Sequence, residues 1–358
     1  MADEKRLQEE LVLSNPPHIR SSDSVRKVMW LVVLSLLPAT INSVYMYGMQ
    51  VVILVGTAIL SAVLAEAVYQ FLLKRSITAL DGSAVITGLL LAMNVPPHVP
   101  AWMVGIGSAF AIIIAKQLFG GIGFNIFNPA LAGRAFLMAS WPVEMTTMWH
   151  PFTSGNVLSS TLPQAHGLPQ KAVDSISSAT PLGVLKEGPG MVQEFGVMPQ
   201  QLHDFLFSNT MLKSLFMGNI GGCIGETSAL FILIGALFLL YRKIITWHIP
   251  VSYIGTVAVI MLTYYLFTGS EMPYRATLFH LLSGGLMLGA FYMATDMVTS
   301  PVTAKGMIIF GIGCGIITSV IRLWGGYPEG VSYSILLMNA AVPLIDRLTK
   351  PRVFGTEK

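Results

Sequence analysis

The chain has 358 residues, of which 53% are hydrophobic and only 11% are charged. Roughly a quarter of the residues are charged in an average soluble domain, so this composition indicates an integral membrane protein. The formal net charge is only +3, and the basic residues cluster at the ends of apolar runs rather than on one face. These features exclude nucleic acid as a main partner.

The two cysteines and the first residues narrow the class further. Cys223 and Cys314 each lie in an apolar, glycine-rich run, and neither has the spacing of a metal-binding pair. This excludes a disulfide framework and a self-contained iron–sulfur or zinc site. Residues 1–27 are polar and contain no cleavable signal, so we expect a cytoplasmic segment followed by a first apolar run that drives insertion.

Ten apolar runs along the chain are candidate membrane spans, since a span needs about 20 such residues. They cover residues 28–47, 49–73, 83–95, 101–119, 126–141, 220–241, 248–268, 277–295, 306–324 and 331–347. The third and fifth runs are too short for free lipid-facing helices, which predicts broken, re-entrant or shielded segments. We therefore expect an all-α polytopic membrane protein with about ten transmembrane helices.

The two halves of the chain contain similar stretches. TGLLLAMNVPP, from Thr87, resembles GGLMLGAF, from Gly284, which is followed by ATDMVTSP. With five spans in each half, an odd number, the second half has to be inverted relative to the first, as in many transporters. We predict two inverted five-helix repeats, over residues 28–141 and 220–347, with sites near the midplane at the broken third, fifth and eighth spans.

The basic residues predict the orientation of the spans. With the N-terminus inside, few of them fall on the outer side, namely Lys171, Lys186, Lys213, Arg275 and Arg322. Both termini, including the tail 348–358, are then cytoplasmic. The long polar segment 142–219 is then extracytoplasmic.

Ionisable residues within a membrane are costly and are functional candidates. Glu66, Asp81 and Asp296 are candidates for an ion pathway, although helix ends also collect carboxylates for structural reasons. Asp81 is equally suited to an N-cap. Lys116 and Asp346 lie within a turn of the inner boundary, where a structural role with the charged end reaching the surface is favoured.

Arg134 differs because it lies in the short fifth span, in a segment that begins at Asn128. Pro129 frees a backbone carbonyl there, and Gly133 permits close approach of another element. A buried guanidinium needs an anionic partner. That partner is either a bound anionic ligand or a carboxylate, such as Glu66.

The long polar segment contains the motif DSISSATPL, which begins at Asp174. The motif fits the pattern Asp-x-x-Ser/Thr-x-Ala-Thr/Ser, with Ser177 and Ala179 at the two inner positions. It resembles the signature recognised by extracytoplasmic flavin transferases. Those enzymes join FMN through its phosphate to the hydroxyl of the last residue, here Thr180. Pro181 keeps the segment extended and out of a helix. The alternative is a Ser/Thr-rich surface loop with an ordinary turn at Asp174.

Three segments carry a family resemblance that spans nearly the whole chain. They are DGSAVITGLLLAMNVPP (81–97), FNIFNPALAGRAFLMASWP (124–142) and SSATPL (177–182). Together they resemble the RnfD family of Rnf complexes, which is related to the NqrB component of the sodium-pumping NADH:quinone oxidoreductase. Family members often have Gly where this chain has Ser178, which exchanges one small residue for another.

The resemblance implies a membrane electron-carrier subunit of a bacterial inner-membrane complex, which couples electron transfer between ferredoxin and NAD to Na⁺ or H⁺ movement. Such a translocase subunit is not catalytic alone, and its partners would be other membrane and peripheral subunits and a flavin transferase. The resemblance implies covalent FMN on Thr180 and a second, noncovalent flavin, riboflavin, in the membrane domain. Arg134 and Asn128 then become candidate flavin contacts.

Other classes stay open on the sequence. A channel or secondary transporter with the same inverted repeats and no redox role is the main alternative, because fold does not fix function. A pure assembly scaffold is another, and the NqrB component of the sodium-pumping enzyme is the alternative within the resemblance. Yellow colour and fluorescence of the denatured chain would distinguish a flavin carrier from a transporter or a scaffold.

Overall fold

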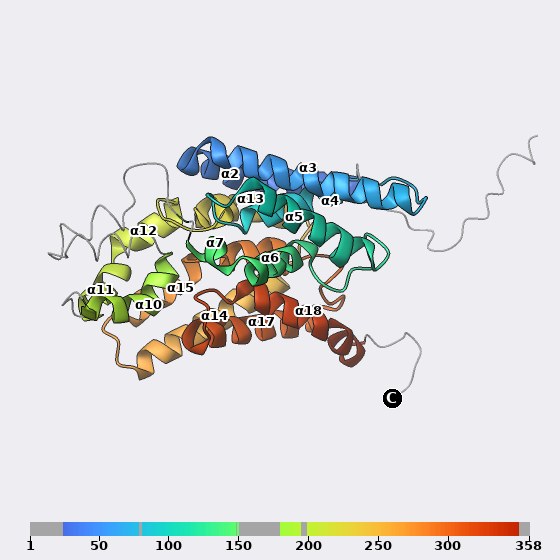
Figure 1. Cartoon of the computed structure of the whole chain (residues 1–358). Coiled ribbons are helices and arrows are strands. Elements are labelled where there is room, and N and C mark those ends of the chain that lie inside the picture. The colour runs from blue at the N-terminus through green and yellow to red at the C-terminus, as the bar shows by residue number, and fades with distance from the viewer. Residues whose placement is uncertain (1–23, 79–80, 148, 150–179, 195–198, 351–358) are drawn as a thin grey trace, which may run out of the picture.

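The computed structural model describes residues 24–78, 81–147, 149, 180–194 and 199–350, and every regular element in them is helical (Figure 1). The predicted all-α class is therefore confirmed for these residues. The elements are α2 (Val25–Tyr47), α3 (Met49–Leu72), α4 (Ser83–Met93), α5 (Ala101–Ile112) with η1 (Ile113–Gln117), α6 (Pro129–Ser140), α7 (Pro142–Thr147), α10 (Pro181–Glu194), α11 (Pro199–Leu206), α12 (Asn209–Met217), η2 (Ile224–Glu226), α13 (Ala229–Tyr241), α14 (His248–Phe267), α15 (Pro273–Leu282), α16 (Leu286–Leu288) with η3 (Gly289–Met293), α17 (Ala304–Trp324) and α18 (Val331–Leu348).

Five helices, α2, α3, α14, α17 and α18, are long and apolar enough to cross a membrane. A sixth apolar unit joins α15 to α16 and η3 with a bend of 62°, and α4, α5 with η1, and α13 are shorter apolar helices. The outward side chains of the long helices include large apolar groups such as Leu60 on α3 and Val259 on α14. These features are those of a polytopic membrane protein.

The two runs predicted to be short are short helices. α4 ends at Met93, and α6 begins at Pro129, where the missing N–H of proline leaves no donor unsatisfied. The side chain of Asn128 caps α6 by accepting a hydrogen bond from the backbone N–H of Leu131 at 3.3 Å. A Cβ at Gly133 would lie 2.9 Å from a backbone oxygen of α5, so glycine is what lets α6 approach α5 closely.

The bundle has two sides with α6 between them. Figure 1 shows α2, α3 and α13 along one side, and α14, α17 and α18 along the other. On the first side α2 packs against α13, and α3 packs against α4 and α5, whereas α14 packs against α17 on the other. The largest apolar core takes buried side chains from both sides, among them Leu91 and Tyr253. The two halves of the chain therefore share one core.

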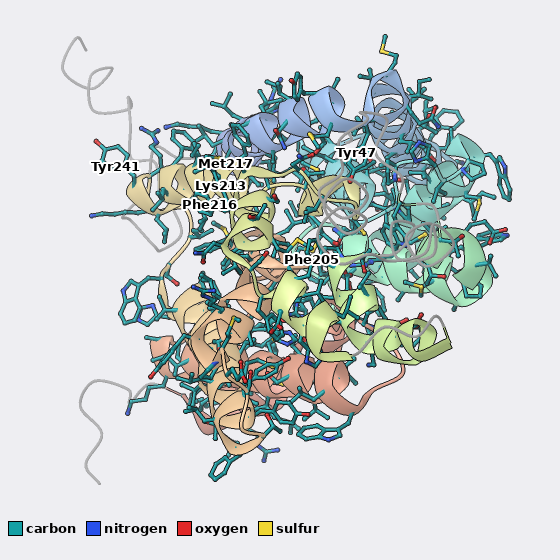
Figure 2. All side chains as sticks on the ribbon, turned by 90° about the vertical axis from the view of Figure 1, so that its left-hand side faces the viewer. Tyr47, Phe205, Lys213, Phe216, Met217 and Tyr241 are labelled. Carbon is teal, nitrogen blue, oxygen red and sulfur yellow. The ribbon has the colours of Figure 1, made fainter. Side chains whose placement is uncertain are left out.

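α10, α11 and α12 lie at one end of the bundle (Figure 1). They come from the segment that was expected only to be polar, and they contribute Phe205 and Leu206 to a second apolar cluster together with Phe279 of α15. Figure 2 views the molecule from this end, with Tyr47 and Phe205 inside the mass of side chains and Tyr241 at its margin. This end is thus a packed part of the fold.

Candidate functional site

Arg134 is buried in the middle of the bundle, on α6. Its Nη2 forms an ion pair with Glu329 Oε2 at 2.6 Å. Its Nη1 donates to Asn94 Oδ1 at 3.1 Å and to Ser332 Oγ at 2.8 Å. The carboxylate partner is therefore Glu329, which precedes α18, and not Glu66.

Arg134 also faces a cavity of about 400 Å³, named here the Thr180 cavity. Its lining includes Arg134, Thr180, Trp149, Tyr333 and Glu329. The volume lies within the range of about 300–1,000 Å³ that is usual for ligand pockets. Apolar walls, aromatic rings and one guanidinium suit a planar aromatic ligand that carries negative charge.

Thr180 lies at the start of α10 and is almost fully buried, with 7% of its surface exposed. Its Oγ1 accepts a hydrogen bond from the N–H of Gly183 at 3.1 Å, and its carbonyl accepts one from Val184 at 2.8 Å. Thr180 therefore caps the N-terminus of α10, where the helix dipole favours the negative charge of a phosphate. The expectation that Pro181 keeps this segment out of a helix is wrong, because Pro181 is the first residue of α10, a position where proline is favoured. The other motif residues, Asp174, Ser177 and Ala179, lie outside the described residues.

Lys186 connects α10 to the C-terminal end of α17 through hydrogen bonds. Its Nζ donates to the carbonyl of Ile321 at 3.2 Å and to that of Tyr327 at 2.9 Å. Partial burial lowers the pKa of the Lys186 ammonium below its usual value. On α11, burial likewise lowers the pKa of the His203 imidazole. The two hydrogen bonds of Lys186 thus help to hold α10 in place at the end of the bundle that contains Thr180.

A second cavity lies at the other end of α6 and is named here the Asn128 cavity. It has a volume of about 120 Å³, and its polar lining includes Asn125, Asn128, Thr87, Lys116 and Asp296. Amide and hydroxyl groups of this kind can bond the edge of a heterocycle. The cavity is smaller than ordinary ligand pockets, so an occupant of flavin size requires it to widen.

Glu66 and Lys116 form a buried ion pair, in which Lys116 Nζ lies 2.9 and 2.8 Å from the two carboxylate oxygens. Lys116 also donates to Ser83 Oγ at 2.6 Å, and Ser83 in turn donates to Asp81 Oδ1 at 2.5 Å. The expectation that Lys116 reaches the surface is wrong, because its side chain is only 3% exposed. Asp81 accepts the backbone N–H of Ser83 at 2.7 Å and so holds the turn into α4.

Asp296 and Asp346 are carboxylates that accept hydrogen bonds from the connection between η3 and α17. Asp296 lines the Asn128 cavity and accepts hydrogen bonds from the N–H of Val298 at 3.3 Å and from Thr299 Oγ1 at 3.1 Å. Asp346 accepts one from the N–H of Val302 at 3.2 Å. The structure thus brings Asp296 near Asn128 through one cavity, whereas Arg134 and Thr180 share the other.

Sequence reasoning missed Glu329, Asn94 and Ser332 as partners of Arg134. Glu329 stands in the short connection Gly-Gly-Tyr-Pro-Glu-Gly between two spans, where a carboxylate reads as an ordinary loop residue. The only indication in the sequence of a partner for Arg134 was that a buried guanidinium needs an anion. Spacing could not identify the partner, because the two residues are 195 positions apart.

Comparison with known proteins agrees with these features. A model of the NQR2, RnfD, RnfE family matches residues 12–355. The D subunit of a Na⁺-translocating ferredoxin:NAD⁺ oxidoreductase complex from Acetobacterium woodii is 48% identical over 97% of this chain and 96% of its own length. The D subunit of a proton-translocating ferredoxin:NAD⁺ oxidoreductase complex from Clostridium ljungdahlii is 44% identical over the full length of both chains. The D subunit of an ion-translocating oxidoreductase complex from Stutzerimonas stutzeri is 42% identical over 94% of this chain and 93% of its own.

Proposed function

Because the chain belongs to the NQR2, RnfD, RnfE family, we propose that it is the electron-carrying RnfD component of a complex that couples ferredoxin:NAD⁺ electron transfer to Na⁺ or H⁺ translocation. Other membrane and peripheral subunits bring electrons to it and take them away. It is part of a bacterial inner-membrane translocase and is not catalytic alone.

FMN is attached through its phosphate to the hydroxyl of Thr180. The observation that carries this proposal is that Thr180 and Arg134 line one cavity of about 400 Å³, with the Thr180 hydroxyl at the N-terminus of α10. The dipole of α10 suits the phosphate, and the Arg134 guanidinium suits negative charge on the ring system. When bound, FMN supplies the electron transfer, whereas the protein supplies position and electrostatics.

Arg134 holds its position through Glu329, Asn94 and Ser332, so its charge stays in the Thr180 cavity. Trp149 and Tyr333 line the same cavity and provide apolar surface against which the ring system can pack. These walls of low polarity strengthen the interaction of Arg134 with negative charge on the ring system. The chain's own residues thus position the cofactor and stabilise its reduced, more negative form.

We further propose that riboflavin binds without a covalent bond at the Asn128 cavity, whose volume of about 120 Å³ would have to increase to admit it. The amides of Asn125 and Asn128 and the hydroxyl of Thr87 line this cavity and bond the polar edge of the ring. Asn128 and Arg134 are six residues apart on α6, which is about 9 Å along a helix axis. α6 therefore connects the two flavin sites.

The membrane domain is built from two inverted repeats of five helices, α2 to α6 and α13 to α18 with α15 and α16 as one broken element. α3 packs on α5 as α14 packs on α17, and α5 packs on α6 as α17 packs on α18. The basic residues at the helix ends support an orientation with both termini in the cytoplasm and Thr180 outside, where a flavin transferase can reach it.

A comparison of Thr180→Val with Thr180→Ser in the complete complex tests the redox function. Val keeps the shape of threonine without the hydroxyl, so ferredoxin-dependent NAD⁺ reduction should fall to background although the complex assembles. Ser keeps a hydroxyl and should retain a substantial part of the activity. Full activity in the assembled Thr180→Val complex would contradict the proposal and favour a transporter or scaffold role.

A further inference from the structure

Glu226 is a buried carboxyl group that the flavin sites do not use. It ends the short helical turn η2, between α12 and α13, and only 5% of its surface is exposed. Its Oε2 accepts one long hydrogen bond, from the N–H of Cys223 at 3.4 Å. Its Oε1 has no hydrogen-bond partner among the residues that the structure describes.

Glu329 faces Glu226 and also has one unsatisfied oxygen. Arg134 occupies Oε2 of Glu329, whereas Oε1 has no hydrogen-bond partner in the described part of the chain. Oxygens of the two carboxyl groups and Sγ of Cys223 all lie within 4.8 Å of one another. Two carboxyl groups, each with an unsatisfied oxygen, therefore meet in the interior of the bundle.

Two arginines lie near this pair, but neither forms a hydrogen bond or an ion pair with Glu226 among the described residues. Arg134, from α6, is committed to Glu329, Asn94 and Ser332. Arg322, from α17, donates its Nη atoms to backbone carbonyls of His280 and Ser283.

The remaining titratable neighbours are neutral donors. Tyr47, from α2, donates to the carbonyls of Ile220 and Gly222. The Cys223 thiol donates to the carbonyl of Asn94 at 3.5 Å. None of these hydrogen bonds reaches Glu226, so an ionised Glu226 would be a buried charge next to a second carboxylate.

Glu66 shows how the same chain surrounds another buried carboxyl group with donors. Lys116 contacts both of its oxygens, and Gln117 Nε2 donates to Oε1 at 2.7 Å. Glu66 is buried as deeply as Glu226, with 1% exposed. The two groups differ in the number of hydrogen-bond donors around them. A single proton on Glu226 would compensate for the missing donors, because a neutral carboxyl group can donate a hydrogen bond to the carboxylate of Glu329.

We propose that Glu226 and Glu329 share one exchangeable proton, so that Glu226 is a proton-binding site within the membrane domain. Glu329 lines the Thr180 cavity, which gives water access to one side of the pair. The proton moves between that water and the pair, and the pair alternates between one and two negative charges beside Arg134. An intramembrane carboxyl group of this kind is a natural element of a proton path.

The test is labelling of the purified complex with N,N′-dicyclohexylcarbodiimide. This apolar reagent takes the proton of a neutral carboxyl group on nitrogen while the carboxylate oxygen adds to its carbon, and the adduct rearranges to a stable N-acylurea. Because the reagent reacts only with the neutral carboxyl group, we expect labelling at Glu226 to exceed that at Glu66 by about tenfold or more at pH 7, as read by peptide mass spectrometry.

Substitutions make the test specific. Glu226→Gln should remove the labelled peptide, and Glu66→Gln should leave labelling at Glu226 unchanged. Glu329→Gln leaves Arg134 without its carboxylate, so Glu226 should ionise in its place and its labelling should fall about tenfold.

Three results would overturn the proposal. The first is equal labelling at Glu226 and Glu66 in the parent complex, and the second is unchanged labelling at Glu226 in Glu329→Gln. The third is protection of Glu226 by NaCl and not by choline chloride, which would make the pair a Na⁺ site. These results do not depend on flavin, so they are distinguishable from failure of the proposed redox function.

Discussion

The two ion pairs described in the membrane domain support their cations differently. Lys116 lies in a closed network with Glu66 and Ser83. Arg134 bonds Glu329 through one nitrogen and faces the Thr180 cavity. Both cations line a cavity, but the three N–H groups of the Lys116 ammonium match three acceptors of its own network, namely the two oxygens of Glu66 and Ser83 Oγ. We therefore infer a structural role for Lys116, and we propose that Arg134 acts toward the flavin of the proposed site.

Arg134→Met should lower the midpoint potential of the bound flavin, since Met fills the volume without the charge. If the charge contributes about 1–3 kcal/mol to the reduced form, the potential of a two-electron couple falls by roughly 20–60 mV. A spectroscopic redox titration of the complex measures it. Arg134→Lys is the control, because it keeps the charge without the forked geometry. An unchanged potential in Arg134→Met would mean that Arg134 is only an ion-pair partner.

Lys116→Met should destabilise the chain by about 3–5 kcal/mol, because it leaves Glu66 charged and buried without a cation. The double variant Lys116→Met with Glu66→Gln should recover much of that loss, since no uncompensated charge is left. Unfolding of the detergent-solubilised complex measures both. Additive losses in the double variant would show that the two side chains are not coupled.

Individual candidate residues could be identified from the sequence better than the residues that they contact. Arg134 stood out because it interrupts a short apolar run, and Thr180 because it ends a motif. Glu226 could be noted as an ionisable residue near the end of the predicted span 220–241, but its partner could not be predicted, and Glu329 did not stand out because it lies in a connection between two spans. Their importance depends on contacts across more than 100 residues of chain, which no local pattern records.

α6 is the element that determines the site, since its two ends line two different cavities. Asn128 begins the helix at one cavity, and Arg134 lies one and two-thirds turns further on, at the other. Gly133 sets the depth of Arg134 by allowing α6 to lie against α5. The placement of the helix therefore controls the placement of the charge.

Gly133→Ala should destabilise the fold by about 1–3 kcal/mol and reduce flavin content, because its Cβ would lie 2.9 Å from the carbonyl oxygen of Gly107. Gly56→Ala on α3 is the matched control, since nothing lies within 4 Å of its Cβ. That substitution should be neutral or stabilise by about 0.5–1 kcal/mol. Similar behaviour of the two variants in thermal unfolding and flavin content would contradict the close approach of α6 and α5.

The elements were predictable where the pattern is local. Run length predicted the shortness of α4 and α6, and the inverted-repeat pattern predicted a broken eighth span, which the structure has between α15 and α16. The contacts that stabilise this break could not be predicted, because they come from another helix. Arg322 of α17 donates hydrogen bonds to the backbone carbonyls of His280 and Ser283, at the end of α15. α10 to α12 were missed, since their apolar faces become visible only through packing against Phe279 and Tyr265.

The whole molecule is a membrane domain with a group of helices, α10 to α12, at one end (Figure 1). Thr180 begins that group, and Arg242 and Lys243 follow the opposite end of α13. Apolar helices with basic residues on one side orient by those residues. We therefore expect one fixed orientation, with α10 to α12 outside.

Reporter fusions test this orientation. A reporter that is active only in the cytoplasm should work after Lys358 and after Lys243, and it should be silent when inserted at Lys171. A reporter that is active only outside should give the reverse pattern. The basis is the small number of basic residues on the outer side. Cytoplasmic activity at Lys171 would contradict the predicted orientation. Thr180 would then be out of reach of an extracytoplasmic flavin transferase.

Covalent FMN on Thr180 is the central claim, and peptide mass spectrometry of the chain coexpressed with its flavin transferase tests it most directly. The peptide that contains Thr180 should be heavier by the mass of FMN less one water, because a phosphoester forms with loss of water. The same peptide from Thr180→Val should carry no such addition, and that from Thr180→Ser should carry it in part. An unmodified Thr180 peptide from the parent chain, with the transferase active on another substrate, would contradict the account.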